Sequence, residues 1–260
     1  PLSRFEVTDV IKGHDHFRVG ETFETYYLGN AQPGELYLAM ATSSPQVEWS
    51  PPILLTERSK RYVLALANLP PGPERLEFFQ DYLGDSDDLL SGDAYNEFAV
   101  APYDDLIVLG PKMNREQLIG FLTDPHVATH HRKLYFTMLG ICGTEADARL
   151  LEKFMVSEDR GSKSGLDALL ACYIKLVAAR GLDKIDELFL KNREADYADI
   201  NAAIMAIRFH GSETDVVPQQ RLAESLRHVL DYPDLADLVI SDLQKWEDWS
   251  ELPKLCELFL

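Results

Sequence analysis

Three histidines in one short stretch come nearest to the spacing of a metal site. His126 and His130 are four residues apart and His131 follows directly, and two imidazoles at such a spacing could reach one zinc ion. Pro125 and Thr129, however, indicate that a helix begins between them, so the pair would straddle a turn. No cysteine or acidic ligand stands at a supporting spacing. We therefore expect an exposed helix start rather than a metal site.

Asp93 and Glu97 are the carboxylates best placed for acid–base chemistry, because they lie four residues apart on one helical face. Glu97 falls beside an apolar stripe, so we expect it to be partly buried with a raised pKa or a basic partner. Paired carboxylates can transfer protons. An ion pair with a residue such as Arg132 on the next pair of helices explains the same placement without chemistry, and we favour that interpretation.

Arg208 interrupts an otherwise apolar helix, and a buried guanidinium needs a carboxylate partner. We expect that partner to be Asp242, on a neighbouring helix of a linear stack. Near the C-terminus, Trp246 and Trp249 are expected to pack under a terminal helix, although an exposed pair of tryptophans would suit a protein interface.

Templates for nucleotides, zinc proteases and serine hydrolases are absent from the sequence, which has no GxGxxG, GxxxxGK[ST], HExxH or GxSxG. We therefore assign no catalytic residue, no metal ligand and no cofactor. The three cysteines, Cys142, Cys172 and Cys256, lie inside apolar helical patterns without a CxxC spacing, so we expect buried free thiols.

The charge balance excludes two classes of partner. The 260 residues carry 43 acidic and 25 basic side chains, a formal net charge of −18, and such a surface repels phosphate backbones and anionic lipid heads. No apolar run approaches the roughly 18 residues that a membrane helix needs. We expect neither nucleic-acid binding nor membrane insertion, and a protein partner with a basic patch instead.

The first 72 residues have the pattern of a small antiparallel β module. Short runs rich in β-branched and aromatic residues, at 4–11, 21–28 and 35–42, are separated by Gly and Pro. Arg61 to Asn68 is predicted to be a last strand, closed by two prolines. About five short strands would suit a closed barrel or a sandwich, because closure removes exposed sheet edges.

Residues 73–260 change to a helical period. The stretch from Asn114 to Val156 reads as helix, turn, helix, turn, helix, with capping-box spacings at Asn114 and Thr144, and Ser164 repeats the device. Segments that mix small and large apolar residues recur, and glycines close three of them at uneven intervals. Each helix pair is too thin to bury its own apolar face, so we expect the pairs to stack in a row.

Three resemblances follow from these residues. Val7, Val10, Ile11, Lys12, Gly13 and Gly20 resemble the opening of OB-like or netrin-like modules, and residues 75–260 look like a HEAT-like α-solenoid. Through Trp49 to Ile53, Asp93 to Asp105 and Asp242 to Ser250, the whole chain is similar to an uncharacterised family of bacterial exported proteins. That family implies no activity, and its members carry a leader and a short cysteine-containing segment ahead of the β module. The chain begins at Pro1 without either, so we expect any targeting segment to precede it.

The expected fold is therefore α+β: a small antiparallel β-barrel or sandwich over residues 1–72, followed by an irregular HEAT-like α-solenoid over residues 73–260. We expect a non-enzymatic interaction scaffold that uses the acidic solenoid surface, and the family resemblance implies a periplasmic or otherwise extracytoplasmic location, with the cytoplasm as the alternative.

Two other functions stay open. One is a metal-dependent or acid–base enzyme built on Asp93, Glu97 and the cluster from His126 to His131. The other is a small-molecule or peptide sensor that uses aromatic residues of the β module such as Tyr26, Tyr27, Tyr37 and Trp49.

Overall fold

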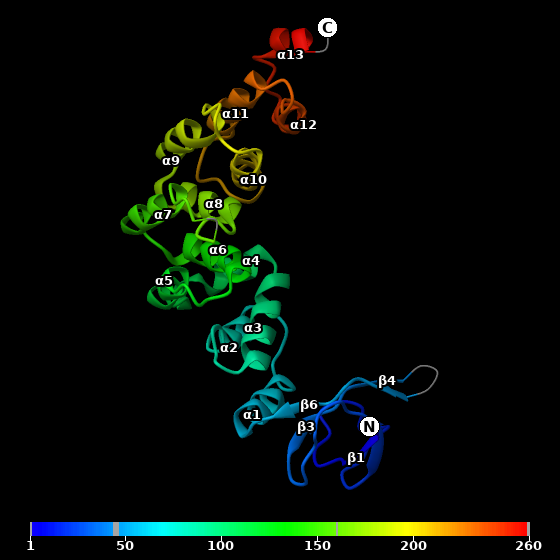
Figure 1. Ribbon diagram of the computed structural model, residues 1–260. Coiled ribbons are helices and arrows are strands. Elements are labelled where there is room, and N and C mark those ends of the chain that lie inside the picture. The colour runs from blue at the N-terminus through cyan, green and yellow to red at the C-terminus, as the bar shows by residue number, and fades with distance from the viewer. Residues whose placement is uncertain (1, 44–46, 160, 259–260) are drawn as a thin grey trace. The chain divides into compact units, whose positions relative to one another are not determined.

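The chain is α+β, with many helices and a few small antiparallel sheets. The computed structural model in Figure 1 describes residues 2–43, 47–159 and 161–258. It divides into two units, Pro1–Glu97 and Phe98–Leu260. The domain boundary that we expect at residue 72 lies before this division at Glu97, and it stays a prediction. Within the described ranges, no helix is both long and apolar enough to span a bilayer.

Three two-stranded antiparallel sheets form the strand region of the first unit. They pair β1 (Leu2–Glu6) with β2 (Thr22–Tyr26), β3 (Leu36–Leu38) with β6 (Ile53–Leu55), and β4 (Ala41–Ser43) with β5 (Val47–Trp49). The strands that the structure describes do not close into a barrel. The small antiparallel sheets agree with the expected class, and the barrel geometry does not appear in them.

Aromatic side chains fill the interior of the strand region. The ring of Phe23 stacks on Phe5, with centroids 5.6 Å apart, and on Trp49, with centroids 3.9 Å apart. Tyr37 meets Phe5 edge-on at 5.3 Å. Two-stranded sheets of this length are not stable alone in water. The ring contacts therefore join sheets that backbone pairing leaves separate.

The predicted strand from Arg61 to Asn68 is wrong. The segment lies mostly in helix α1 (Glu57–Leu66), which begins at Thr56, where the Thr56 and Ser59 side chains form a reciprocal capping box. After the cap, the sequence offers leucine and alanine with only one β-branched residue, Val63, so helix propensity and the cap agree. Helices α2 (Pro73–Gln80) and α3 (Asp88–Val100) follow.

The second unit is helical throughout its described part. After α3 the α-helices are α4 (Tyr103–Leu109), α5 (Arg115–Thr123), α6 (Arg132–Cys142), α7 (Ala148–Met155), α8 (Leu166–Val177), α9 (Ala179–Ile185), α10 (Tyr197–Glu213), α11 (Gln219–Arg227), α12 (Asp237–Lys245) and α13 (Leu252–Leu258). Short 3-10 segments η1 (Gly110–Lys112), η2 (Thr129–His131), η3 (Glu145–Asp147) and η5 (His228–Asp231) connect some of them, and η4 (Asp186–Leu190) is a π-helix.

Alternate helices of this unit pack on one another. Helix α6 lies against α4 and α8, and α8 against α10, while α5, α7, α9 and α11 flank this row (Figure 1). A small residue allows the closest approach, since a Cβ on Gly140 of α6 would lie 3.3 Å from the Cα of Cys172 in α8. The core runs along the row and includes Phe136, Leu139, Leu169, Ile174 and Ile207, all fully buried.

Helix capping confirms most of the expected start signals. The Asn114 side chain accepts a hydrogen bond from the Gln117 backbone N–H at 3.1 Å, and Thr144 forms a capping box with Asp147. The predicted helices of the stretch from Asn114 to Val156 correspond to α5, α6 and α7. Ser164 is not a cap, because α8 begins after Gly165 and the Ser164 hydroxyl donates to the Thr129 carbonyl instead.

Candidate functional site

The expected histidine cluster does not assemble a metal site. The His126 N–H donates to Asp124 in the turn before η2, and the rings of His130 and His131 meet edge-on with centroids 4.2 Å apart. Partial burial, and secondarily His130, lower the pKa of His131. Nowhere in residues 2–43, 47–159 and 161–258 do three His, Cys, Asp or Glu side chains gather closely enough to hold a metal ion.

Asp93 and Glu97 are each engaged within the first unit. The Tyr62 hydroxyl donates to Asp93 at 2.6 Å, and Arg75 donates to both carboxylate oxygens of Glu97, at 2.9 and 2.7 Å. The hydrogen bond from Arg75 lowers the pKa of Glu97 despite its burial. Of the two expected alternatives for Glu97, the basic partner is confirmed and the raised pKa is wrong. The partner is Arg75 and not Arg132.

Arg132 is buried without a carboxylate partner among the described residues. It donates to the carbonyl of Leu122 at 2.8 Å, and its guanidinium lies over the rings of Phe136 and Phe154, 5.3 and 4.8 Å from their centroids. Burial lowers the pKa of Arg132. Arg132 thus joins α6 to the end of α5 and to Phe154 of α7. The expected pairing of Arg132 with Glu97 is wrong.

The structure brings Arg208 and Asp242 together. The guanidinium donates to both carboxylate oxygens, at 2.8 and 2.6 Å, and to the Leu238 carbonyl at 3.0 Å. The hydrogen bonds to Asp242 raise the pKa of Arg208. Every polar group of this pair has a partner, which is the arrangement of a structural tie between α10 and α12.

His210, two residues after Arg208 in α10, is fully buried and satisfied at both ring nitrogens. Its Nε2 lies 2.9 Å from the Ala171 carbonyl, and its Nδ1 lies 2.7 Å from the Thr214 hydroxyl. Because a carbonyl can only accept, Nε2 carries the proton and the hydroxyl donates to Nδ1. Burial lowers the pKa of His210 to about 4, so the ring is neutral at neutral pH.

The two tryptophans lie in different environments. Trp246 is half-buried against α10, where a Cβ on Gly211 would lie 2.2 Å from its ring, so only glycine fits at that position. Trp249 is 54% exposed. The structure thus places Trp246 in packing and leaves Trp249 on the surface.

A polar cluster that the sequence did not suggest lies between α9 and α11. Asp186, the first residue of the π-helix η4, is 1% exposed and accepts a hydrogen bond on Oδ2 from Arg221 at 3.0 Å. Its other oxygen, Oδ1, has no hydrogen-bond partner among the described residues. Leu182 and Phe189, four residues before and three after Asp186, lie on the same helical side and are buried too.

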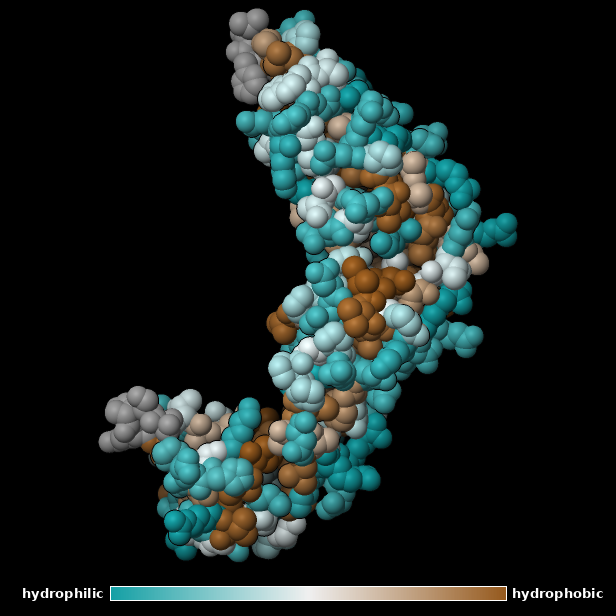
Figure 2. Space-filling model, turned by 180° about the vertical axis from the view of Figure 1, so that it is seen from behind, coloured by the Kyte–Doolittle hydropathy of each residue, from teal (hydrophilic) through white to brown (hydrophobic). Residues whose placement is uncertain are grey.

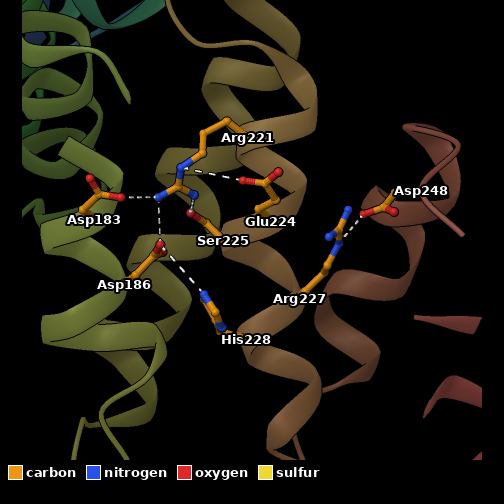
Figure 3. Close-up of polar contacts among 8 residues, drawn as sticks. All are labelled: Asp183, Asp186, Arg221, Glu224, Ser225, Arg227, His228 and Asp248. Carbon is orange, nitrogen blue, oxygen red and sulfur yellow. Dashed lines mark hydrogen bonds and ion pairs between the residues drawn. The ribbon is translucent and has the colours of Figure 1, made fainter. Parts of the chain in front are cut away.

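Arg221 is the centre of this cluster, as Figure 3 shows. Its guanidinium also donates to Asp183 at 2.8 Å and to the Ser225 hydroxyl at 2.7 Å, and Glu224 lies 4.0 Å away. Burial lowers the pKa of Arg221, but its hydrogen bonds to Asp183 and Asp186 outweigh burial and raise it. One cation thus faces three carboxylates.

The cluster opens into a hollow of about 520 Å³. Charged side chains of both signs line it: Asp183, Asp186, Lys191, Arg221, Glu224, Arg227, His228, Asp231, Glu251 and Lys254. Arg227 donates to Asp248 at 2.7 Å and Lys254 pairs with Asp231, so these two cations are engaged. His228 Nε2 lies 3.9 Å from Asp186, and burial lowers its pKa although Asp186 opposes that shift.

Carboxylates, guanidinium groups, two ammonium groups, one imidazole and the Ser225 hydroxyl surround Arg221 and the hollow, so the arrangement can bind a ligand through charge and hydrogen bonds. The one signal in the sequence was an aspartate on an apolar stripe, between Ile185 and Phe189, where a charge must find a partner. π-Helical segments often mark functional sites, which gives this cluster the strongest claim in the described chain.

Comparison of the chain with protein-family models, with curated proteins and with solved structures finds no match to any of them.

Proposed function

We propose that the protein is a non-enzymatic interaction scaffold whose helical unit, an irregular HEAT-like α-solenoid, binds a basic patch of a partner protein. A row of stacked helix pairs presents an extended surface, which is how solenoids bind. The step from this architecture to binding is an analogy from fold. The location outside the cytoplasm, implied by the family resemblance, is part of the same proposal.

Ion pairs at a nearly constant interval along the chain support the stacking. Arg115 pairs with Asp147, Lys133 with Asp167, Lys163 with Asp199 and Arg208 with Asp242, at separations of 32, 34, 36 and 34 residues. Each pair links one helix pair to the next along the chain. A recurring interval of this size is typical of two-helix repeats.

The proposal rests on the exposed acidic side chains that take no part in these ion pairs. They neutralise basic side chains inside the unit, whereas Glu187, Glu194 and Asp196 are exposed and form no ion pair with any described residue. Figure 2 shows a largely hydrophilic face with brown apolar patches between the polar residues. An acidic surface of this kind attracts a partner of opposite charge and speeds its association.

Charge reversal tests the proposal with a matched control. The test variant carries Glu187→Lys, Glu194→Lys and Asp196→Lys, and the control carries Glu6→Lys, Asp15→Lys and Glu48→Lys, an equal change in net charge on the other unit. A partner captured with the wild-type chain from its native cell is then titrated against all three proteins at about 50 and 500 mM salt.

We expect the test variant to bind at least about tenfold more weakly at low salt, the control to bind within about twofold of wild type, and wild-type affinity to fall with salt. A partner whose affinity is independent of salt would show that the acidic surface does not recruit it. Equal losses in both variants would show that only net charge matters.

A further inference from the structure

A single residue, Ala178, connects α8 to α9 (Figure 1). Its φ and ψ angles are 55° and −144°, a backbone conformation that is open to glycine and strained for a residue with a Cβ. Neighbouring connections have residues suited to their turns, since Gly143 and the Thr144 cap separate α6 from α7, and Gly165 precedes α8. The chain therefore turns at Ala178 at the expense of backbone strain.

The sequence across this turn is that of one continuous helix. Ala178 and Ala179 are the best helix formers, and residues 166–190 contain no proline and only one glycine. Buried residues on both sides of the turn follow each other at intervals of three or four: Leu170, Ile174, Val177, Gly181 and Ile185. An apolar stripe of helical period thus passes through the turn without a shift. Local propensity and the observed fold disagree at this point.

Contacts between the parts before and after Ala178 hold the turn closed. Helix α10 packs along α8, and the Nε2–H of His210 donates to the Ala171 carbonyl. Lys184 of α9 lies 2.9 Å from Glu152 of α7. Each of these contacts joins two surfaces that every copy of the chain carries. A second copy can therefore supply the same contacts in the same geometry.

We propose that Ala178 is a hinge at which α8 and α9 join into one helix, and that the released helices α9–α13 then dock onto α4–α8 of a second copy. The product is a two-fold symmetric, domain-swapped dimer in which the contacts between the two parts are remade. Each hinge loses its strain and gains a helical turn, while the pair of chains loses the entropy of association. The inference is independent of the proposed scaffold function.

Two properties of the chain oppose this exchange. Opening has to separate α10 from α8, and the core along these helices includes the fully buried Leu169, Ile174 and Ile207. Exchange therefore requires partial unfolding and is slow. Each chain also carries a net charge of −18, so two copies repel each other at low salt. We expect the dimer to form at high protein concentration, in salt and after warming.

Two glycine substitutions in adjacent residues separate the hinge from helix propensity. Ala178→Gly relieves the positive φ and weakens a continuous helix, so both effects oppose opening. Ala179→Gly is the matched control, because Ala179 is helical in the closed chain and remains helical in the open one. Glu247→Gly is a second control, since Glu247 also has a positive φ, of 56°, but follows α12.

The dimer is measured on the full chain after annealing. Wild type and the three variants are held at about 0.5 mM in about 300 mM salt, just below the midpoint of thermal unfolding, and then cooled. Size-exclusion chromatography with light scattering gives the fraction of dimer. Fluorescence transfer between two differently labelled dimers, mixed at room temperature, gives the rate of subunit exchange. Circular dichroism checks that each variant is folded.

We expect wild type to form a dimer that exchanges its subunits over about an hour or more, because exchange requires partial unfolding. Ala178→Gly should lower the dimerisation constant fixed by annealing at least about 100-fold, since each dimer contains two hinges and each changes about tenfold. Ala179→Gly and Glu247→Gly should each leave this constant within about threefold of wild type.

Absence of a wild-type dimer after annealing would overturn the inference. A dimer as abundant in Ala178→Gly as in wild type would show that the strained turn does not drive exchange. Subunit exchange within seconds would identify an ordinary surface contact between closed chains. An equal loss of dimer in Ala178→Gly and Ala179→Gly would assign the effect to helix propensity alone and remove the hinge.

Discussion

Two junctions between helices of the second unit both pair an arginine with a buried aspartate. One of them leaves an aspartate oxygen without a hydrogen bond, and the other does not. Between α10 and α12, Arg208 and Asp242 form two hydrogen bonds, and a backbone carbonyl takes a third. Between α9 and α11, Arg221 faces three carboxylates, and Asp186 Oδ1 has no partner in the described chain. The first junction is complete by itself, and the second has an excess of acceptors.

The difference separates a junction whose polar groups are all bonded from one that leaves a buried acceptor without a partner among the described residues. A buried ion pair with every group satisfied is explained by its structural role, whereas an unsatisfied buried group calls for a separate explanation. Perturbed ionisation does not make this distinction, because His210 has a strongly lowered pKa and yet both its nitrogens are bonded.

The largest expected effect is the dependence of stability on pH from His210, a satisfied polar group of α10 that bonds to α8. The folded pKa is about 4, below the ordinary value of 6.5, so the unfolded chain binds more protons between these values. The stability that the neutral ring contributes is full above pH 6.5 and is lost as pH falls toward 4. We expect a loss of about 3 kcal/mol across this window, measured by urea denaturation in steps of pH.

His210→Gln provides the control, because the amide is uncharged at every pH in the window and can still hydrogen-bond. The difference in unfolding free energy between wild type and this variant should shrink steadily from pH 6.5 to 4. Parallel curves would show that His210 has the same pKa in the folded and the unfolded chain, and that its burial against α8 does not exclude the proton.

A smaller effect is expected from Asp242→Asn, which leaves the shape of the complete junction and removes its charge. Arg208 would keep one acceptor and lose a charged partner, which costs about 2 kcal/mol for a largely buried carboxylate. Because the Arg208 side chain is 38% exposed, water limits the loss. Denaturation at neutral pH measures it. A change below about 0.5 kcal/mol would place this pair with ordinary surface ion pairs.

Local signals made much of the helical unit predictable. The caps at Asn114 and Thr144 and the apolar period between them gave the three helices α5, α6 and α7. The error at Arg61 to Asn68 has a local cause as well, because the capping pair that starts α1 lies just before that segment. Barrel closure was not predictable, since it depends on strand pairings that are distant in sequence and short.

The candidate site was harder to predict than the complete junction. Arg208 stood alone in an apolar helix, so its need for a partner was visible, and Asp242 was a reasonable choice one repeat away. Asp186 lies in a segment rich in charge, and although it falls on an apolar stripe, nothing local reveals that α11 covers this face. Which residues meet 35 positions apart depends on how one helix pair is rotated on the next.

Asp186→Asn should change stability least, and it is the same chemical change as at Asp242. The variant loses a charge-assisted hydrogen bond to Arg221 but also removes an uncompensated buried charge, and Arg221 keeps Asp183 and Glu224. Because these terms oppose each other, we expect the unfolding free energy to stay within about 0.5 kcal/mol of wild type. Denaturation of both asparagine variants under the same conditions measures the contrast. If Asp186→Asn costs as much as Asp242→Asn, both junctions are structural, and the unused oxygen of Asp186 does not set them apart.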